Sequence, residues 1–264
     1  MFFFPSFLMT DEERKARAKW AKEEKERRLP LCVPWDPKVK WEPELNIKAD
    51  SYPVRHLFEG VAASSARVDA LQESQFVDSP DGNWRYCVKL IPRGEKLDTW
   101  YGSKTGSVLF DGPVHIPAIH QKRHSEWEKN PWMSLTPAEI ISMRGGLRRA
   151  KGRTIVVGLG LGHLLIDVSL RKQVTSLVLV EKSQQLVDWI LPRVKPFMRS
   201  GLEVEVVIGD AMKEMPKLSA DVALVDIFDT YGNNDCERDQ LRRECKNIGY
   251  IWVWGAAVTN GDGW

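Results

Sequence analysis

From Arg153 onward, short apolar runs alternate with amphipathic stretches, and this alternation constrains the fold more than any other feature of the sequence. The apolar runs are TIVVG, SLVLVE, EVEVVIGD, ADVALVD and YIWVWG, and the helix-like stretches between them begin near Gly162, Ser183, Ala211 and Asn234. Buried apolar strands that alternate with amphipathic helices are typical of a doubly wound, mostly parallel α/β sheet. We therefore predict a Rossmann-like domain over residues 136–264.

A glycine-rich turn follows the first apolar run, with a glycine at every second position: Gly158, Gly160 and Gly162. Such a turn between a strand and a helix lets a nucleotide approach the main chain, although alone it is weak evidence. Glu181 ends the second run, about twenty residues after the glycines, where an acidic side chain can hold ribose hydroxyls. Asp210 and Asp226 end the third and fourth runs. Because the carboxyl ends of parallel strands meet at one edge, we expect these carboxylates around a nucleoside-binding crevice.

These segments resemble the core of class I S-adenosylmethionine-dependent methyltransferases, and the similarity covers residues 153–231. Within that class, TIVVGLGLGHLL, VEVVIGDAMKEM and ADVALVDIFDTYG are most similar to the spermidine synthase group. The resemblance implies that the three glycines line the methionine part of the cofactor, which is S-adenosylmethionine or its decarboxylated form. It also implies that Glu181 binds the ribose, and that Asp210 with the backbone of Ala211 binds the adenine.

Two aspartates in the stretch DIFD, Asp226 and Asp229, stand where spermidine synthases carry a paired-aspartate motif that includes the catalytic base. By this resemblance, Asp226 or Asp229 would orient or deprotonate an amine or hydroxyl acceptor. Upstream, YGSKTGSVLFDG resembles the β-hairpin that precedes the core in those enzymes, and RHSEW falls near their lid-proximal helix.

Two positions separate this sequence from parts of the family. Val156 is apolar where many methyltransferases have an acidic residue, a choice that spermidine synthases share. Leu161 stands where the synthases carry an aspartate for the aminopropyl ammonium, and an ammonium buried without a carboxylate partner is unfavourable. The Asn/Asp-Pro-Pro-aromatic motif of amino-methyltransferases is missing after ADVALVD, so methylation of a nucleic-acid base is not supported.

The function that we expect from these residues is S-adenosylmethionine-dependent methyl transfer to a small or peptide-like acceptor. Two alternatives stay open: a polyamine aminopropyltransferase like spermidine synthase, and a non-catalytic binding or structural protein that retains the methyltransferase fold. Leu161 and the unusual content of 11 tryptophans favour the non-catalytic alternative.

The stretch YIWVWGAAV is followed only by TNGDGW, so we expect the antiparallel hairpin that completes this core to be absent. The last strand would place Ile251 and Val253 on one face and two tryptophans on the other, and its unpaired apolar edge would need a cover. The candidates are the proline-rich strap LPLCVPWDPKVKWEPEL, a second subunit or, if the sequence is truncated, residues beyond it. We favour a homodimer, because the prolines of the strap cannot donate to a strand ladder.

The N-terminal part of the chain begins with a helix signal. In TDEERKARAKWAKEEKERR, Thr10 is an N-cap and Glu13 completes a capping box, so a charged helix is predicted to end before Pro30. The stretches NWRYCVKLIP and TWYGSKTGSVLFDGPVHIP predict a small antiparallel β unit. A second helix is expected from Thr136 to Gly145. The expected parts are residues 1–45 with tail, helix and strap, 46–135 with the β-hairpin region, and 136–264 with the Rossmann-like domain.

Composition narrows the partners and the compartment. The formal net charge is only +2, so nothing in it argues for nucleic acid or a membrane surface. We interpret the opening MFFFPSFLM as a packing or partner-binding tail, and no apolar run reaches the roughly 20 residues that span a bilayer. Four widely spaced cysteines without a CxxC pair indicate reduced thiols and a cytoplasmic protein.

Histidines are the remaining candidate site residues. His120 and His124 would lie one turn apart in a helix, and His115 is nearby, but no acidic or cysteine ligand stands beside them. No metal is therefore expected. His163 directly follows the glycines, and a neutral packing imidazole is favoured there over a substrate contact.

Overall fold

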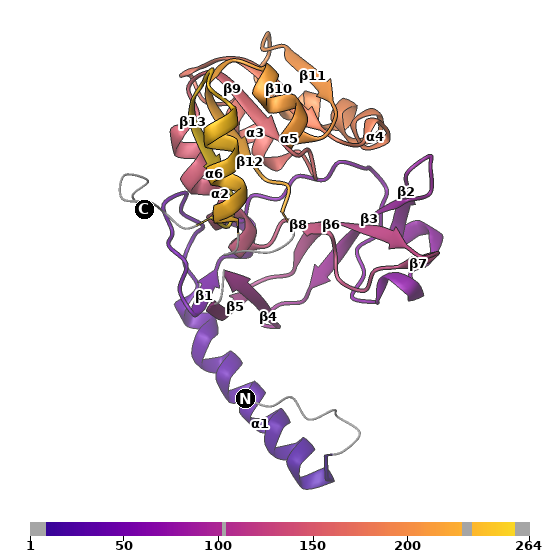
Figure 1. Ribbon diagram of the computed structural model, residues 1–264. Helices are drawn as coiled ribbons and strands as arrows, with labels where there is room; N and C mark the ends of the chain where they lie inside the picture. The colour runs from indigo at the N-terminus through magenta and orange to yellow at the C-terminus, as the bar shows by residue number, and fades with distance from the viewer. Residues whose placement is uncertain (1–8, 102–103, 229–233, 257–264) are drawn as a thin grey trace. The chain divides into compact units, whose positions relative to one another are not determined.

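The computed structural model describes residues 9–101, 104–228 and 234–256, and Figure 1 shows its elements. Contacts group the chain into two compact units that are discontinuous in sequence. The first unit contains the residues up to Pro53 together with Ile91–Thr99 and Gly106–Val114, and the second contains Val54–Leu90, Trp100–Thr105 and the residues from His115 onward. Strands β4 (Lys96–Tyr101) and β5 (Lys104–Phe110) contribute residues to both units. The division into residues 1–45, 46–135 and 136–264 stays a prediction.

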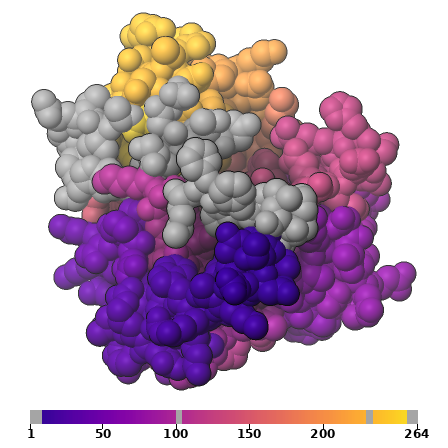
Figure 2. Space-filling model, turned by 90° about the horizontal axis from the view of Figure 1, so that it is seen from below, coloured from indigo at the N-terminus to yellow at the C-terminus, as the bar shows by residue number. Residues whose placement is uncertain are grey.

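Helix α1 (Asp11–Arg28) opens the first unit and has the predicted capping box. The Glu13 amide donates to Thr10 Oγ1 over 3.2 Å, and the Thr10 amide donates to Glu13 Oε2 over 2.7 Å. Nearly all side chains of α1 are exposed, and its last turn is basic. Figure 2 shows the indigo surface of the N-terminal residues. The helix is therefore a solvated charged element, as its sequence predicts.

A buried arginine holds the small sheet of the first unit, which has the strand order β1-β5-β4. Strand β1 (Glu44–Ile47) pairs in parallel with β5, so the proline-rich strap ends in a strand. Arg28 is fully buried and donates to Asn46 Oδ1 over 2.7 Å, to Ser107 Oγ over 2.9 Å and to the Leu45 carbonyl over 2.9 Å. These bonds join the end of α1 to both strands.

The described residues also contain short 3₁₀ helices: η2 (Leu29–Leu31), η3 (Ala49–Ser51), η4 (Val68–Ala70), η5 (Glu73–Gln75), η6 (Lys195–Phe197) and η7 (Met215–Lys217).

The second unit contains a sheet with the order β2-β3-β6-β7, in which β8 pairs with β6. Its strands are β2 (Phe76–Asp78), β3 (Trp84–Ile91), β6 (Val114–Arg123), β7 (Glu126–Trp127) and β8 (Met133–Ser134). The pairs β2 with β3, β6 with β7 and β6 with β8 are antiparallel, which confirms the predicted antiparallel unit.

RHSEW, expected near a helix, instead forms the turn between β6 and β7, where His124 and Ser125 have positive φ angles. Strand geometry also removes the helical spacing considered for His120 and His124. His120 is buried, and its Nδ1 lies 2.9 Å from the Glu128 carbonyl oxygen.

The predicted Rossmann-like sheet forms the rest of the second unit, with the strand order β11-β10-β9-β12-β13 and parallel pairing throughout. Its strands are β9 (Gly152–Val157), β10 (Val174–Glu181), β11 (Val204–Ile208), β12 (Ala220–Val225) and β13 (Ile248–Val253). The helices are α2 (Pro137–Arg149), α3 (His163–Ser169), α4 (Gln184–Val194), α5 (Ala211–Glu214) and α6 (Asp235–Glu244). The order of the strands reverses between β9 and β12, and open α/β sheets bind ligands outside such a switch point.

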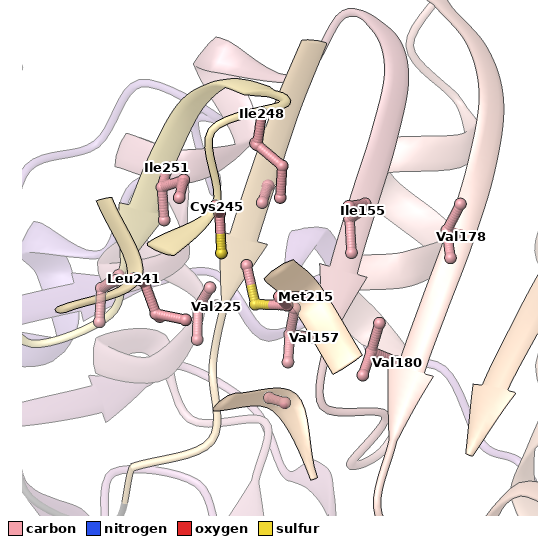
Figure 3. Packing of buried hydrophobic residues seen from close by; sticks show 13 residues of the cluster. Ile155, Val157, Val178, Val180, Met215, Val225, Leu241, Cys245, Ile248 and Ile251 are labelled. Atoms are coloured by element: carbon pink, nitrogen blue, oxygen red, sulfur yellow. The ribbon is translucent and has the colours of Figure 1, made fainter. Parts of the chain in front are cut away.

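The core on one face of this sheet includes Ala211 of α5 and Leu241 of α6, and Figure 3 shows the residues of this cluster. Valines at the ends of three neighbouring strands, Val157, Val180 and Val225, pack with Met215 and Leu241. All five side chains are at most 1% exposed, so this layer fixes the carboxyl ends of the strands that carry the candidate site.

Helix α2 covers part of the other face and is longer than predicted. It continues through Gly145 to Arg149, because the glycines provide space for an aromatic ring rather than a helix end. A Cβ atom on Gly146 would lie 2.5 Å from Cε3 of Trp252. Trp254 Nε1 donates to Ser142 Oγ over 2.8 Å, so Trp252 of β13 and Trp254 directly after it both face α2. The predicted alternation along this strand is thereby confirmed.

Strand β13 ends the sheet among the described residues. The Trp254 amide donates to Val225 of β12, so the alternate residue Ile251 directs its carbonyl away from β12. Arg242 of α6 donates to that carbonyl over 3.2 Å and covers part of the edge. The strand in the strap pairs with β5, and residues 257–264 lie outside the described part of the chain, so the absence of a hairpin and the homodimer stay predictions.

Candidate functional site

The glycine-rich turn connects β9 to α3 at the switch point, next to β12. Gly158 has a φ of 90°, and a Cβ atom there would lie 2.2 Å from the Asp226 carbonyl oxygen. Gly162 has a φ of 71°, and its Cβ would lie 2.3 Å from Val194 Cγ2. Both positions therefore need glycine for conformation and for space. The turn brings bare main chain to the sheet edge where the sequence predicts a ligand.

Glu181 is tied directly to this turn. Its side chain is buried at the end of β10, where one carboxylate oxygen accepts from the Leu159 amide over 2.8 Å. The other oxygen accepts from the Ser183 amide over 2.9 Å. A carboxylate can accept about four hydrogen bonds, so two amide donors leave acceptor capacity for two hydroxyl groups. Glu181 thus orders the turn and can bind a ribose at the same time.

Asp210 and Ala211 lie at the start of α5, after β11. Asp210 is the N-cap of that helix, and its Oδ1 accepts from the Met212 amide over 2.9 Å. Ala211 is buried in the core cluster. The implied contact of this pair with adenine stays a prediction.

The carboxyl of Asp226 interacts electrostatically with a second carboxyl, that of Glu139. Asp226 directly follows β12, and its amide donates to the Val157 carbonyl over 3.0 Å. Glu139 lies in the first turn of α2, where its amide donates to Thr136 Oγ1 over 3.4 Å. Burial raises the pKa of both carboxyls, and the charge of Asp226 raises the pKa of Glu139 further.

A carboxyl pair of this kind can retain a proton near neutral pH and exchange it with an acceptor group. Asp226 was predicted at this edge from the order of the strands, whereas no sequence signal pointed to Glu139, which lies in the first turn of another element, α2. Asp229, the other aspartate of the DIFD stretch, lies outside the described residues.

His163 lies in a side-chain network with Arg55 and Asp167. Its Nδ1 lies 2.9 Å from Arg55 Nη1, and Arg55 Nη2 donates to Asp167 Oδ1 over 2.9 Å. Because a guanidinium only donates, Nδ1 accepts and the ring proton is on Nε2, 3.3 Å from Asp167 Oδ2. Burial lowers the pKa of His163. This geometry supports the neutral packing imidazole favoured from the sequence.

Leu161 and Met133 meet at the middle of the turn. The Leu161 side chain is 2% exposed, so it belongs to the core, while its amide lies 3.2 Å from Met133 Sδ. A Cβ atom on Gly160 would lie 2.3 Å from the same sulfur. Met133 is half-buried on β8, far from the turn in sequence, and nothing in the sequence pointed to this contact.

Residues 9–101, 104–228 and 234–256 contain neither a candidate metal site nor a candidate membrane-spanning helix. No group of three histidine, cysteine, aspartate or glutamate side chains there is arranged to hold a metal ion. No helix in the same ranges is long and apolar enough to cross a membrane.

Neither a family model nor a curated protein matches this sequence. The parallel sheet, its strand order and the turn after β9 form a doubly wound, Rossmann-like fold. Among solved structures, a SAM-dependent methyltransferase from Thiobacillus denitrificans in complex with S-adenosyl-L-homocysteine is 21% identical, over 45% of this chain and 48% of its own, with a TM-score of 0.34.

Two further structures align over part of the chain. Spermidine synthase from Thermotoga maritima is 12% identical, over 70% of this chain and 61% of its own, with a TM-score of 0.35. A precorrin 8W decarboxylase from Methanobacterium thermoautotrophicum is 19% identical, over 42% of this chain and 57% of its own, with a TM-score of 0.31. The chain therefore spans between 48% and 61% of the length of these proteins.

Proposed function

We propose that this protein binds S-adenosylmethionine at the glycine-rich turn and transfers its methyl group to a small or peptide-like acceptor. The observation that carries the proposal is the Glu181 carboxylate, which is buried at the switch point, is ordered by the Leu159 amide and retains acceptor capacity. A buried carboxylate with unused lone pairs is suited to a pair of vicinal hydroxyls, which are the recognition feature of a ribose.

The chain's own residues divide the work in this proposal. Glu181 binds the ribose hydroxyls, and Asp210 with the Ala211 backbone binds the adenine. The bound cofactor supplies an electrophilic methyl group on a sulfonium. Asp226, with Glu139 beside it, holds the acceptor and takes its proton, and Asp229 assists if it reaches the same edge. Most of the rate gain would come from holding the acceptor in line with the methyl group.

Leu161 argues against aminopropyl transfer, because the position that would need a carboxylate for an ammonium carries an apolar side chain buried in the core. The four cysteines, none of which forms a disulfide, fit a reducing compartment, and we propose a cytoplasmic location.

Calorimetric titration with S-adenosylmethionine and S-adenosylhomocysteine tests the proposal. We expect both to bind, and Glu181→Ala to weaken binding by about 1 to 3 kcal/mol, because charge-assisted hydrogen bonds to the ribose are lost. Glu203→Ala, which removes an exposed carboxylate next to β11, is the matched control and should bind as the natural protein does.

If neither S-adenosylmethionine nor S-adenosylhomocysteine binds, the proposal is overturned and the non-catalytic alternative is left. Formation of spermidine from putrescine and decarboxylated S-adenosylmethionine would instead support the aminopropyltransferase alternative.

A further inference from the structure

The Met133 side chain is held against the glycine-rich turn by a fixed piece of backbone. Met133 pairs with Ile119 of β6. The Trp132 amide donates to the Ile119 carbonyl over 2.8 Å, and the Leu135 amide donates to the Pro117 carbonyl over 3.2 Å. Hydrogen bonds on both sides of Met133 therefore anchor β8, while its unbranched side chain keeps rotational freedom.

The contact between the Met133 sulfur and the Leu161 amide is a weak hydrogen bond for a main-chain amide in a glycine-rich turn. A thioether sulfur is a poor hydrogen-bond acceptor, yet it is the acceptor 3.2 Å from the Leu161 amide. Main-chain amides in such a turn bind an anionic group more strongly than they bind sulfur. The absence of a Cβ on Gly160 leaves the space that the sulfur fills.

We propose that Met133 is a displaceable plug on the glycine-rich turn, and that a nucleoside bearing an amino-acid carboxylate displaces it to reach the Leu161 amide. This inference rests on the proposed function, because it needs the nucleoside to bind at this turn. The carboxylate replaces a weak N–H to sulfur contact with a charge-assisted hydrogen bond, and the Met133 side chain rotates away without movement of β8.

The plug lowers the apparent affinity, since the ligand binds only to the fraction of molecules in which the turn is open. If the plug is closed in about nine molecules of ten, its removal raises the apparent affinity about tenfold. Met133→Ala should therefore bind S-adenosylhomocysteine about tenfold more tightly than the natural protein in calorimetric titration. Met133→Leu, which fills a similar volume without an acceptor atom, should show a smaller gain.

Met198→Ala, at a half-buried methionine just after η6, is the matched control and should leave the affinity unchanged. Thermal unfolding without ligand checks that each variant is folded, and Met133→Leu keeps the test valid if Met133→Ala is not. The decarboxylated analogue of S-adenosylhomocysteine, which cannot replace the sulfur with a carboxylate, should bind the natural protein more weakly than S-adenosylhomocysteine does.

Equal or weaker binding of S-adenosylhomocysteine by both Met133 variants would overturn the plug and leave the proposed function in place, with Met133 as a wall of the site. Equal binding of the decarboxylated analogue by the natural protein would overturn the role of the carboxylate. Absence of binding by the natural protein and by every variant would remove both proposals.

Discussion

Replacing Glu139 by glutamine should make the fold less sensitive to alkaline pH. Burial, and for Glu139 also the charge of Asp226, raises the pKa of Glu139 from 4.5 to about 8 and that of Asp226 from 3.8 to about 7. Because both pKa values are higher in the folded state than in the unfolded chain, the stabilisation is fully present below about pH 4 and is lost as the pH rises through 7 to 8.

The size of the loss follows from these pKa values. An isolated carboxyl whose pKa rises from about 4 to about 7 on folding loses about 4 kcal/mol of stabilisation over this range. Part of the rise at Glu139 comes from Asp226, so the pair loses less than twice that amount. Glu139→Gln removes one of the two charges and the repulsion between them. We expect the variant to recover about 2 to 4 kcal/mol at pH 9 relative to the natural protein.

Urea unfolding at half-unit steps between pH 5 and pH 9 measures this difference. Glu203→Gln, at an exposed carboxylate of the same unit, is the control and should follow the natural protein at every pH. If the difference in the free energy of unfolding between Glu139→Gln and the natural protein is the same at pH 5 and at pH 9, the pKa of Glu139 is not raised in the folded state and the reasoning fails.

Two further predictions concern packing. Arg28→Ala should lower the free energy of unfolding by about 3 to 5 kcal/mol, because it leaves the buried Ser107 hydroxyl and Leu45 carbonyl without their donor. Arg14→Ala, on the exposed part of α1, is the control and should have little effect. Equal urea midpoints for the two variants would contradict this prediction. Gly146→Ala should destabilise the fold by about 1 to 3 kcal/mol, since the added Cβ would lie 2.5 Å from the Trp252 ring. At Gly201, which has a φ of 76°, an added Cβ meets no atom within 4 Å, so any loss of stability in Gly201→Ala reports backbone strain alone. Equal decreases in the melting temperatures of the two variants would argue against the clash.

The parallel sheet could be predicted because its information is local. Each strand is an apolar run, each helix is an amphipathic stretch between two such runs, and the turn glycines stand between the first strand and its helix in sequence. The chemistry of the ends of β9, β10 and β12 could therefore be placed at one edge from residue order alone. Even the two faces of β13 followed from simple alternation.

The rest depended on contacts between distant residues. Gly145 looked like a helix end because the sequence does not show that Trp252 packs on the next glycine. Met133 and Glu139 belong to other elements than the glycine-rich turn and β12, so no motif spacing connects them to the site. Arg28 is one of many charges in α1, and only the structure shows that this one is buried.

The discontinuous first unit has a consequence for synthesis on the ribosome. The chain passes between the two units after Pro53, Leu90, Thr99, Thr105 and Val114, and the partner of Arg28 on β5 is 79 residues later. At translation rates of about 5 to 20 residues per second, roughly 4 to 16 seconds pass between the synthesis of Arg28 and the synthesis of Ser107. The charged surface of α1 keeps this helix solvated during that time. Arg28 can remain hydrated until β5 is made and the arginine is buried against both strands.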